Sequence, residues 1–174
     1  IEVEQTIPYP NGEPGFYFVR LRYSDQADAL FTAEGAARHV LQEDTVIIEG
    51  EAVRVRYSRL DSGAIQQVFD GDEFTLGRTE EANPAVFELT FSRPRVFRGV
   101  EVIVGSIQAR ITVTLTPAEG SSVAYTVIAR GSLEAPKVAL DFDAPVTASL
   151  VRVEVENINE KEPAHIHVWE IRMK

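Results

Sequence analysis

From residue 45 to the end of the chain, apolar and polar residues alternate in short runs. In residues 52–57, for example, Val53 and Val55 alternate with Arg54 and Arg56. A period of two residues is typical of β-strands that bury one face. The runs predicted as strands are 45–48, 52–57, 85–91, 96–104, 109–116, 123–129, 137–142, 150–156 and 166–173. Because clusters of Pro, Gly, Asn and Asp separate these runs, the pattern predicts an antiparallel β-sandwich or barrel.

The start of the chain has a different pattern. Residues 1–15 are rich in Pro and Gly, which predicts an extended lead-in with turns. Residues 16–23 alternate as a strand would. Residues 25–42 carry a loose helical stripe that Asp25 can cap and Gly35 interrupts, so we expect one broken helix or two short ones.

These patterns divide the chain into residues 1–45 and residues 46–174. The first part is an N-terminal arm or accessory segment made of a strand and a broken helix. It either packs on the second part or is the tail of a preceding domain. The second part is the predicted sandwich, and 174 residues are enough for one such core plus an appendage.

Composition excludes several classes of protein and site. The chain has no cysteine, so disulfides, thiolate metal sites and cysteine nucleophiles are excluded. Its formal net charge of -10 argues against nucleic acid as a partner, because phosphate binding needs a basic face. No apolar run approaches the roughly 20 residues of a transmembrane helix. The chain starts at Ile1 without an initiator Met or a signal sequence, which indicates a mature or excised fragment.

An acidic loop offers the first candidate for bound chemistry. Asp70, Asp72 and Thr75 place three oxygen-bearing side chains within six residues, and Gly71 allows a tight turn between them. Such oxygens suit a hard cation. An ordinary Asp-Gly turn explains the same spacing, since Asp also binds its own backbone.

Four pieces of the sequence together resemble the galactose-binding-domain-like β-sandwich, the jelly roll of discoidin (coagulation factor type C) domains and many carbohydrate-binding modules. The likeness covers about 120 residues. The pieces are Val55-Arg56-Tyr57-Ser58, Phe69-Asp70-Gly71-Asp72 with Thr75, the strands within 86–104, and Val151-Arg152-Val153 with the closing Val168-Trp169-Glu170-Ile171. The expected fold class is therefore mainly β, an antiparallel jelly-roll β-sandwich with a short α/β N-terminal extension.

The resemblance also implies a cofactor. Many members of this family hold one structural calcium ion between the Asp-Gly-Asp loop and a Glu of the last strand. At the matching positions, the implied calcium ligands are Asp70, Asp72, Thr75 and Glu170. The chain departs from the family pattern at Gly77, where an aromatic residue is common, and at residues 118–121, which replace a Ser-Asp-Gly turn.

Sugar recognition calls for an aromatic platform and planar polar side chains on loops at one end of the sandwich. Loop residues of this kind are Arg59, Asp61, Arg78, Asn83, Asn157, Asn159 and His165. Solvation explains polar loops equally well. Trp169, the only Trp, falls in a predicted strand, so we expect it to pack in the core rather than stack on a ligand.

A third pattern suggests a metal-dependent enzyme. His165 and His167 are two residues apart, and Glu170 follows three residues later. Histidines that make ordinary hydrogen bonds explain this spacing better, because the third histidine, His39, lies in the N-terminal segment. No Gly-x-Ser-x-Gly elbow or Gly-rich phosphate loop is present.

The sequence therefore favours a non-catalytic binding module, carbohydrate-binding by resemblance and appended to a larger extracytoplasmic protein. A second hypothesis is a structural or interaction domain of the same fold that binds a neighbouring domain, in a membrane-anchored envelope protein. The metal-dependent enzyme at His165, His167 and Glu170 is a remote third.

Overall fold

The computed structural model describes residues 2–20, 24–105, 108–130 and 137–174. The chain divides into two compact units, Ile1–Ala37 and Arg38–Lys174. Residues 21–23 of the strand predicted at 16–23 lie outside the described residues.

The first unit contains a β-hairpin. Strands β1 (Glu2–Pro8) and β2 (Pro14–Arg20) pair antiparallel, and Gly12 has a positive φ of 86° in the turn between them. Prolines lie at the strand ends and in the turn, where a missing N–H removes no ladder bond. The prediction of an extended lead-in at residues 1–15 was therefore wrong, because those prolines flank a strand instead of excluding one.

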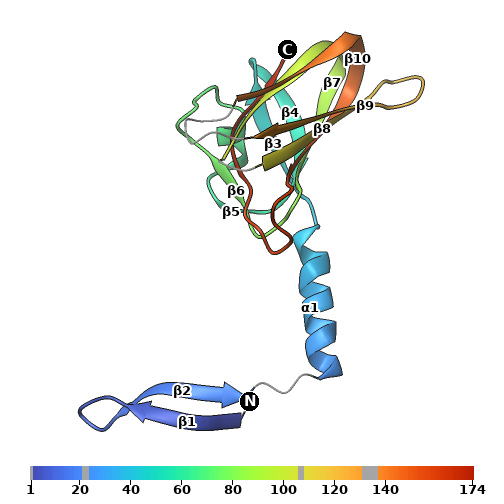
Figure 1. Cartoon of the computed structure of the whole chain (residues 1–174). Helices are drawn as coiled ribbons and strands as arrows, with labels where there is room; N and C mark the ends of the chain where they lie inside the picture. The colour runs from blue at the N-terminus through green and yellow to red at the C-terminus, as the bar shows by residue number, and fades with distance from the viewer. Residues whose placement is uncertain (1, 21–23, 106–107, 131–136) are drawn as a thin grey trace. The chain divides into compact units, whose positions relative to one another are not determined.

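Helix α1 (Asp25–Arg38) follows the hairpin in the sequence (Figure 1). It runs without interruption through Gly35, so the predicted break is wrong; one glycine costs about 1 kcal/mol in a helix and does not end it. Ser24, rather than Asp25, caps the first turn, since its hydroxyl accepts a hydrogen bond from the Ala27 N–H. With 14 residues α1 is too short to span a bilayer, and no other described helix could do so.

The second unit is built from antiparallel strands, which confirms the predicted mainly β sandwich. Its elements are β3 (Gln42–Ile48), β4 (Glu51–Tyr57), β5 (Leu60–Ser62), a 3-10 turn η1 (Ile65–Val68), β6 (Gly77–Thr79), β7 (Ala85–Val104), β8 (Gln108–Thr116), β9 (Val123–Arg130), β10 (Lys137–Asn157) and β11 (His167–Met173). The predicted strand pairs 85–91 with 96–104 and 137–142 with 150–156 are each one long strand. The short strands β5 and β6 were not predicted.

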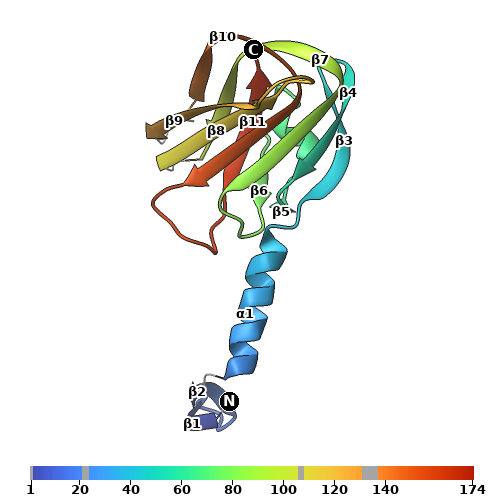
Figure 2. The same cartoon turned by 90° about the vertical axis from the view of Figure 1, so that its right-hand side faces the viewer.

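Strands β7 and β10 pass through both layers of the sandwich (Figures 1 and 2). In one layer, the first half of β7 and the second half of β10 pair, with β4 and β3 on one side and β8 and β9 on the other. In the other layer, their remaining halves pair, and the order continues from β7 to β11, β6 and β5. The edge formed by β5, β6 and β11 carries the candidate residues Asp61, Arg78 and Glu170.

Alternating apolar side chains of both layers form one core. Phe87 and Leu89 of β7 are fully buried, as are Val113 of β8 and Val153 of β10. The Phe87 ring also meets the edge of Phe69, with 6.3 Å between centroids, and so ties the acidic loop to the core.

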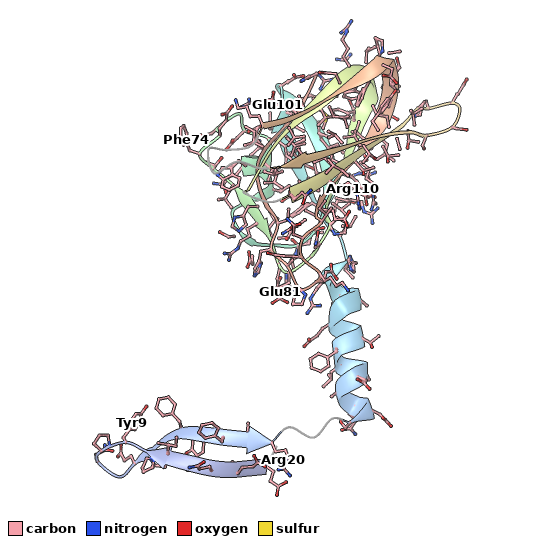
Figure 3. All side chains as sticks on the ribbon, viewed as in Figure 1. Tyr9, Arg20, Phe74, Glu81, Glu101 and Arg110 are labelled. Atoms are coloured by element: carbon pink, nitrogen blue, oxygen red, sulfur yellow. The ribbon has the colours of Figure 1, made fainter. Side chains whose placement is uncertain are left out.

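We predict that Phe87→Ala lowers the free energy of unfolding by about 3–5 kcal/mol, because it leaves a cavity between the layers. The matched control is Phe74→Ala, since Phe74 is 94% exposed and projects from its loop (Figure 3). Urea unfolding of the two variants measures the difference. A loss below about 1 kcal/mol for Phe87→Ala would contradict the described core.

Candidate functional site

The acidic loop between η1 and β6 forms a turn closed by its own side chains. Gly71 has φ of 82°, which confirms the predicted turn. Asp70 Oδ1 accepts a hydrogen bond from the Asp72 N–H at 2.9 Å, and Asp70 Oδ2 lies 3.1 Å from the Thr75 hydroxyl oxygen. The loop therefore holds Asp70 and Thr75 against one another.

The side chain of Glu170, in β11, contacts the backbone of this loop. Its side chain is buried, with 2% of the residue exposed, and its Oε2 accepts a hydrogen bond from the Gly71 N–H at 3.0 Å. Burial raises the pKa of Glu170 to about 7; the Gly71 N–H and the Arg172 cation lower it, while the Asp70 and Glu73 carboxylates add to the rise. Of the four implied calcium ligands, Asp70 and Thr75 are in contact and Glu170 binds the backbone of the same loop, whereas the Asp72 carboxylate accepts from the Phe74 N–H.

The loop contains more acceptor oxygens than donors. The Thr75 hydroxyl has one hydrogen to donate, yet Asp70 Oδ1 and Oδ2 and the carbonyl oxygens of Gln67 and Asp72 all lie within 3.3 Å of it. In the described part of the chain, no three His, Asp or Glu side chains form a metal-holding group. Carbonyl and hydroxyl oxygens are also calcium ligands, so the surplus of acceptors fits a hard cation.

A second group of polar side chains lies along β5 and β6. Arg78 of β6 donates two hydrogen bonds to the Asp61 carboxylate, from Nε at 2.8 Å and from Nη2 at 2.9 Å. These bonds from Arg78 hold the pKa of Asp61 below its usual range. His165 Nδ1 lies 2.8 Å from the Thr79 carbonyl oxygen, which can only accept, so Nδ1 carries the hydrogen. The structure therefore groups three of the predicted loop residues, Asp61, Arg78 and His165.

An aromatic pair extends this group along β11. His167 is in register with Arg78 of β6, and its ring meets Trp169 edge-on, with 5.9 Å between centroids. Burial lowers the pKa of His167, and the nearby Arg78 and His165 lower it further, so the ring is neutral at pH 7. Gly105 leaves room for the indole, since a Cβ there would lie 3.4 Å from Trp169 Cζ3.

The expectation that Trp169 packs in the core is wrong. Trp169 is only partly buried and is not among the core residues. Alternation along β11 buries Val168 and Glu170 and leaves His167 and Trp169 on the outer side; only Ile171, which follows the register shift and is also buried, breaks it. Alternation counted from Val168 therefore places Trp169 outside, and this signal was present in the sequence.

The predicted asparagines join two loops. The Asn83 amide donates to the Asn157 and Glu160 carbonyls at 2.9 and 3.0 Å, and Asn83 Oδ1 accepts from the Asn157 N–H. Asn157 is 3% exposed, and its Oδ1 accepts from the Asn159 N–H. Arg59, also predicted as a ligand residue, forms an ion pair with Glu80 at 2.5 Å.

Among the described residues, His165, His167 and Glu170 do not form the metal site that the third hypothesis requires. Glu170 is buried and binds the Gly71 N–H, whereas His167 is on the outer side of the same strand. His165 precedes β11 and binds the Thr79 carbonyl. The three side chains therefore share no site.

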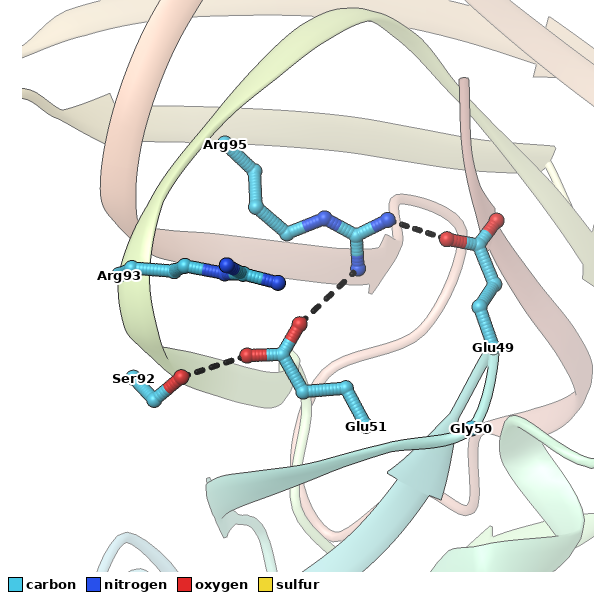
Figure 4. Close-up of a pocket in the computed structure, with 6 residues that line it drawn as sticks. All are labelled: Glu49, Gly50, Glu51, Ser92, Arg93 and Arg95. Atoms are coloured by element: carbon cyan, nitrogen blue, oxygen red, sulfur yellow. Dashed lines mark hydrogen bonds and ion pairs between the residues drawn. The ribbon is translucent and has the colours of Figure 1, made fainter.

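Two cavities at the sandwich surface are lined by described residues. One of about 320 Å³ borders the acidic loop, with Asp70, Gly71 and Glu170 in its wall. The other, of about 740 Å³, lies where the β3–β4 turn meets the bend of β7 (Figure 4). Arg95 pairs there with Glu49 and Glu51, and the Ser92 hydroxyl donates to Glu51 at 2.6 Å. These charges neutralise one another at the bend.

The chain matches no protein-family model and, by sequence, no curated protein. Solved structures do resemble it. A chitosan-binding module of a Paenibacillus sp. IK-5 chitosanase/glucanase has a TM-score of 0.55 and 18% identity, over 69% of this chain and 92% of that one. The family 32 carbohydrate-binding module of C. perfringens NanJ, solved with galactose, has a TM-score of 0.54 and 9% identity, over 70% and 92%. The chain has the galactose-binding-domain-like β-sandwich fold.

One similar structure extends beyond the sandwich. SpGH29 matches with a TM-score of 0.52 and 16% identity, over 97% of this chain and 34% of its own. The match includes nearly all of the N-terminal unit as well as the sandwich. The chain thus spans about a third of the length of SpGH29.

We predict that stability in the presence of a chelator falls as the pH rises from 4.5 to about 7 and then levels off, because over this range the folded state holds a proton on Glu170 that the unfolded state has lost. Below pH 4.5 this carboxyl is protonated in both states; between 4.5 and 7 the folded state binds a proton that the unfolded state lacks. Its stabilising contribution, at most about 3 kcal/mol, is therefore lost as the pH rises through 7.

The Glu170→Gln variant tests this assignment, because its amide oxygen can still accept from the Gly71 N–H. We expect it to be more stable than the native chain at pH 8 and to show a flatter dependence of unfolding free energy on pH. Parallel pH profiles for the two proteins in urea unfolding would rule out Glu170 as the titrating group.

Proposed function

We propose that the sandwich is a carbohydrate-binding module that binds sugar on the outer side of the β5, β6 and β11 edge. The observation that carries this proposal is the cross-strand group of Trp169, His167 and Arg78, with Asp61 and His165 beside it. A partly exposed indole offers a flat apolar surface for the C–H face of a sugar ring. The planar polar groups next to it suit the hydroxyl groups around the same ring.

The protonation states of this group support the same role. Asp61 is ionised at pH 7, because Arg78 lowers its pKa, and it accepts hydrogen bonds. The neutral His167 can both donate and accept. His165 donates from Nδ1 to the Thr79 carbonyl oxygen, so Nε2 is the ring nitrogen that we expect to face a sugar hydroxyl. The face thus combines donors and acceptors, as sugar hydroxyls require.

We further propose that the module belongs to a larger extracytoplasmic protein. Support comes from similar solved structures, which include a chitosan-binding module, a module in complex with galactose and a pectin-binding module. In SpGH29 the matched part is 34% of the chain. A module for polymeric sugars meets its ligand outside the cytoplasm.

The acidic loop is our proposed site for one structural calcium ion. Asp70, Asp72, Thr75 and Glu170 are its side-chain ligands in this proposal, and carbonyl oxygens of the loop complete the set. The ion would supply positive charge to a loop that has a surplus of acceptors. Its role would be structural, because the loop and the β7 strand share the Phe69 and Phe87 contact.

We predict that Trp169→Ala and Arg78→Gln each weaken glycan binding at least tenfold, about 1.4 kcal/mol. Trp169→Ala removes the stacking surface, and Arg78→Gln removes a cation that also orients Asp61. The matched control is Arg110→Gln, because Arg110 is a partly exposed arginine of β8 that pairs with Glu156.

The measurement is a screen of the native chain on galactose, chitosan oligosaccharides and pectin oligosaccharides, followed by calorimetric titration of each variant with the best ligand. Equal losses in all three variants would place the sugar elsewhere. Absence of binding to every glycan would overturn the proposal and favour an interaction domain of the same fold.

We predict that calcium raises the thermal midpoint of the native chain relative to a chelator, since a ligand that binds only the folded state stabilises it. At a concentration 100 times the dissociation constant, the gain is about 2.7 kcal/mol. Asp70→Ala should abolish most of this gain, whereas Asp143→Ala, which changes an exposed aspartate of β10, should keep it. Calorimetry with and without calcium measures both; an equal midpoint for the native chain in both buffers would remove calcium from the loop.

A further inference from the structure

The hairpin of β1 and β2 exposes apolar side chains on both of its faces. Because side chains of a strand alternate, Phe16 and Phe18 lie on one face and Tyr17 and Val19 on the other. The exposed apolar residues of the hairpin are Val3, Ile7, Tyr9, Phe16, Tyr17, Phe18 and Val19, each at least 41% exposed. If one face of the hairpin were exposed to solvent, the residues of that face would be mainly polar.

The hairpin cannot cover these side chains by itself. Within it, Tyr9 meets Phe16 with 6.0 Å between ring centroids, and both residues stay about half exposed or more (Figure 3 labels Tyr9). Isolated two-stranded hairpins are marginally stable in water. The uninterrupted apolar run from Phe16 to Val19 is typical of a strand that is covered on both faces.

The outer edges of the hairpin also have no ladder partner in the described chain. There β1 and β2 pair only with each other and form a two-stranded sheet. An open edge with apolar flanks favours pairing with another strand. The hairpin thus has the hydrogen-bonding groups and the side chains of strands inside a larger sheet.

A second copy of this chain is a poor occupant. Two hairpins that stack face to face would cover one apolar face each and leave the other in water. Two hairpins that pair edge to edge would cover neither face. A β-domain with its own second layer and flanking strands can cover both faces at once.

The similarity to SpGH29 indicates where such a domain belongs. The match covers 97% of this chain, so it includes nearly all of the hairpin and α1, and it occupies 34% of a longer polypeptide. In that polypeptide the corresponding segments are therefore part of one continuous chain with other folded regions.

We propose that β1 and β2 are strands of a neighbouring β-domain of the same polypeptide, which pairs with their open edges and covers both of their apolar faces. The N-terminal unit is then part of that domain, and α1 connects it to the sandwich. This inference goes beyond sugar binding and is independent of it.

Hydrogen–deuterium exchange on the 174-residue chain and on the complete natural gene product tests the proposal. We expect the hairpin amides to exchange at least about 100-fold more slowly in the complete product, because the neighbouring domain closes their edges and faces. Fast exchange in both, or equally slow exchange in both, would overturn it. Sandwich amides of β8 serve as the internal control.

Two variants of the complete product test the two faces separately. Phe16→Ser and Tyr17→Ser should each speed exchange of the hairpin amides at least tenfold, whereas Phe74→Ser, in the loop of the sandwich, should not. A response to only one of the two hairpin variants would indicate a one-faced contact, such as a dimer, and would contradict the proposal.

A deletion distinguishes this proposal from the alternative in which the hairpin packs on the sandwich of the same chain. Residues 38–174 form a compact unit with their own core. We expect this fragment to melt at the same temperature as the 174-residue chain. A clearly lower midpoint for the fragment would show that the hairpin stabilises the sandwich and would overturn the proposal.

Discussion

The pairing of β7 with β10 is the constraint on which the sandwich depends. The two strands pair in three stretches, through Leu89 and Val151, through Val96 and Thr147, and through Val100 and Leu140, with a register shift between each. Both layers therefore contain the same two strands, which are neighbours inside the first layer, while β10 forms the edge of the second. Because the pairs in both layers bury their side chains in one core, the layers cannot separate without breaking these ladders.

This arrangement positions the candidate sites. The second half of β7 pairs with β11, and β11 pairs with β6. This strand order places β11 and β6 side by side near one edge of that layer. Arg78 and His167 meet there in register. The acidic loop precedes β6, and the inward side chain of Glu170 reaches it at Gly71. The position of the polar face and of the loop thus follows from the strand order.

Alternation in the sequence was enough to predict most strands of the sandwich, but not β5 and β6 or the continuity of β7 and β10. Residues Ser92 to Arg95 are polar and include Pro94, a pattern that indicates a break. In the structure Pro94 lies at the bend, where the ladder between β7 and β10 is interrupted and a missing N–H costs nothing. Whether two alternating runs form one strand depends on their partners, which a local pattern does not contain.

The candidate sites were predictable to different degrees, because a local sequence pattern shows contacts within a loop but not pairing between distant strands. Asp70, Gly71 and Thr75 are close in sequence, so their mutual contacts follow from local turn chemistry. The sugar-binding face that we propose joins β5, β6 and β11; the first two have three residues each, too few to show a period. Trp169 was expected inside because it falls in a predicted strand, although alternation from the buried Val168 places it on the outer side with His167.

Alternation of side chains makes β11 a link between the two candidate sites. Trp169 and Glu170 are neighbours in sequence but face opposite sides, one outward beside His167 and the other inward beneath the acidic loop. The backbone that orients the indole is therefore held by the bond between Glu170 and Gly71. Ionisation of a buried carboxylate strains its surroundings unless a cation or more donors compensate for it. The charge state of Glu170 therefore affects the order of the β11 backbone at Trp169. A cation in the loop would act on the proposed sugar-binding face through this strand.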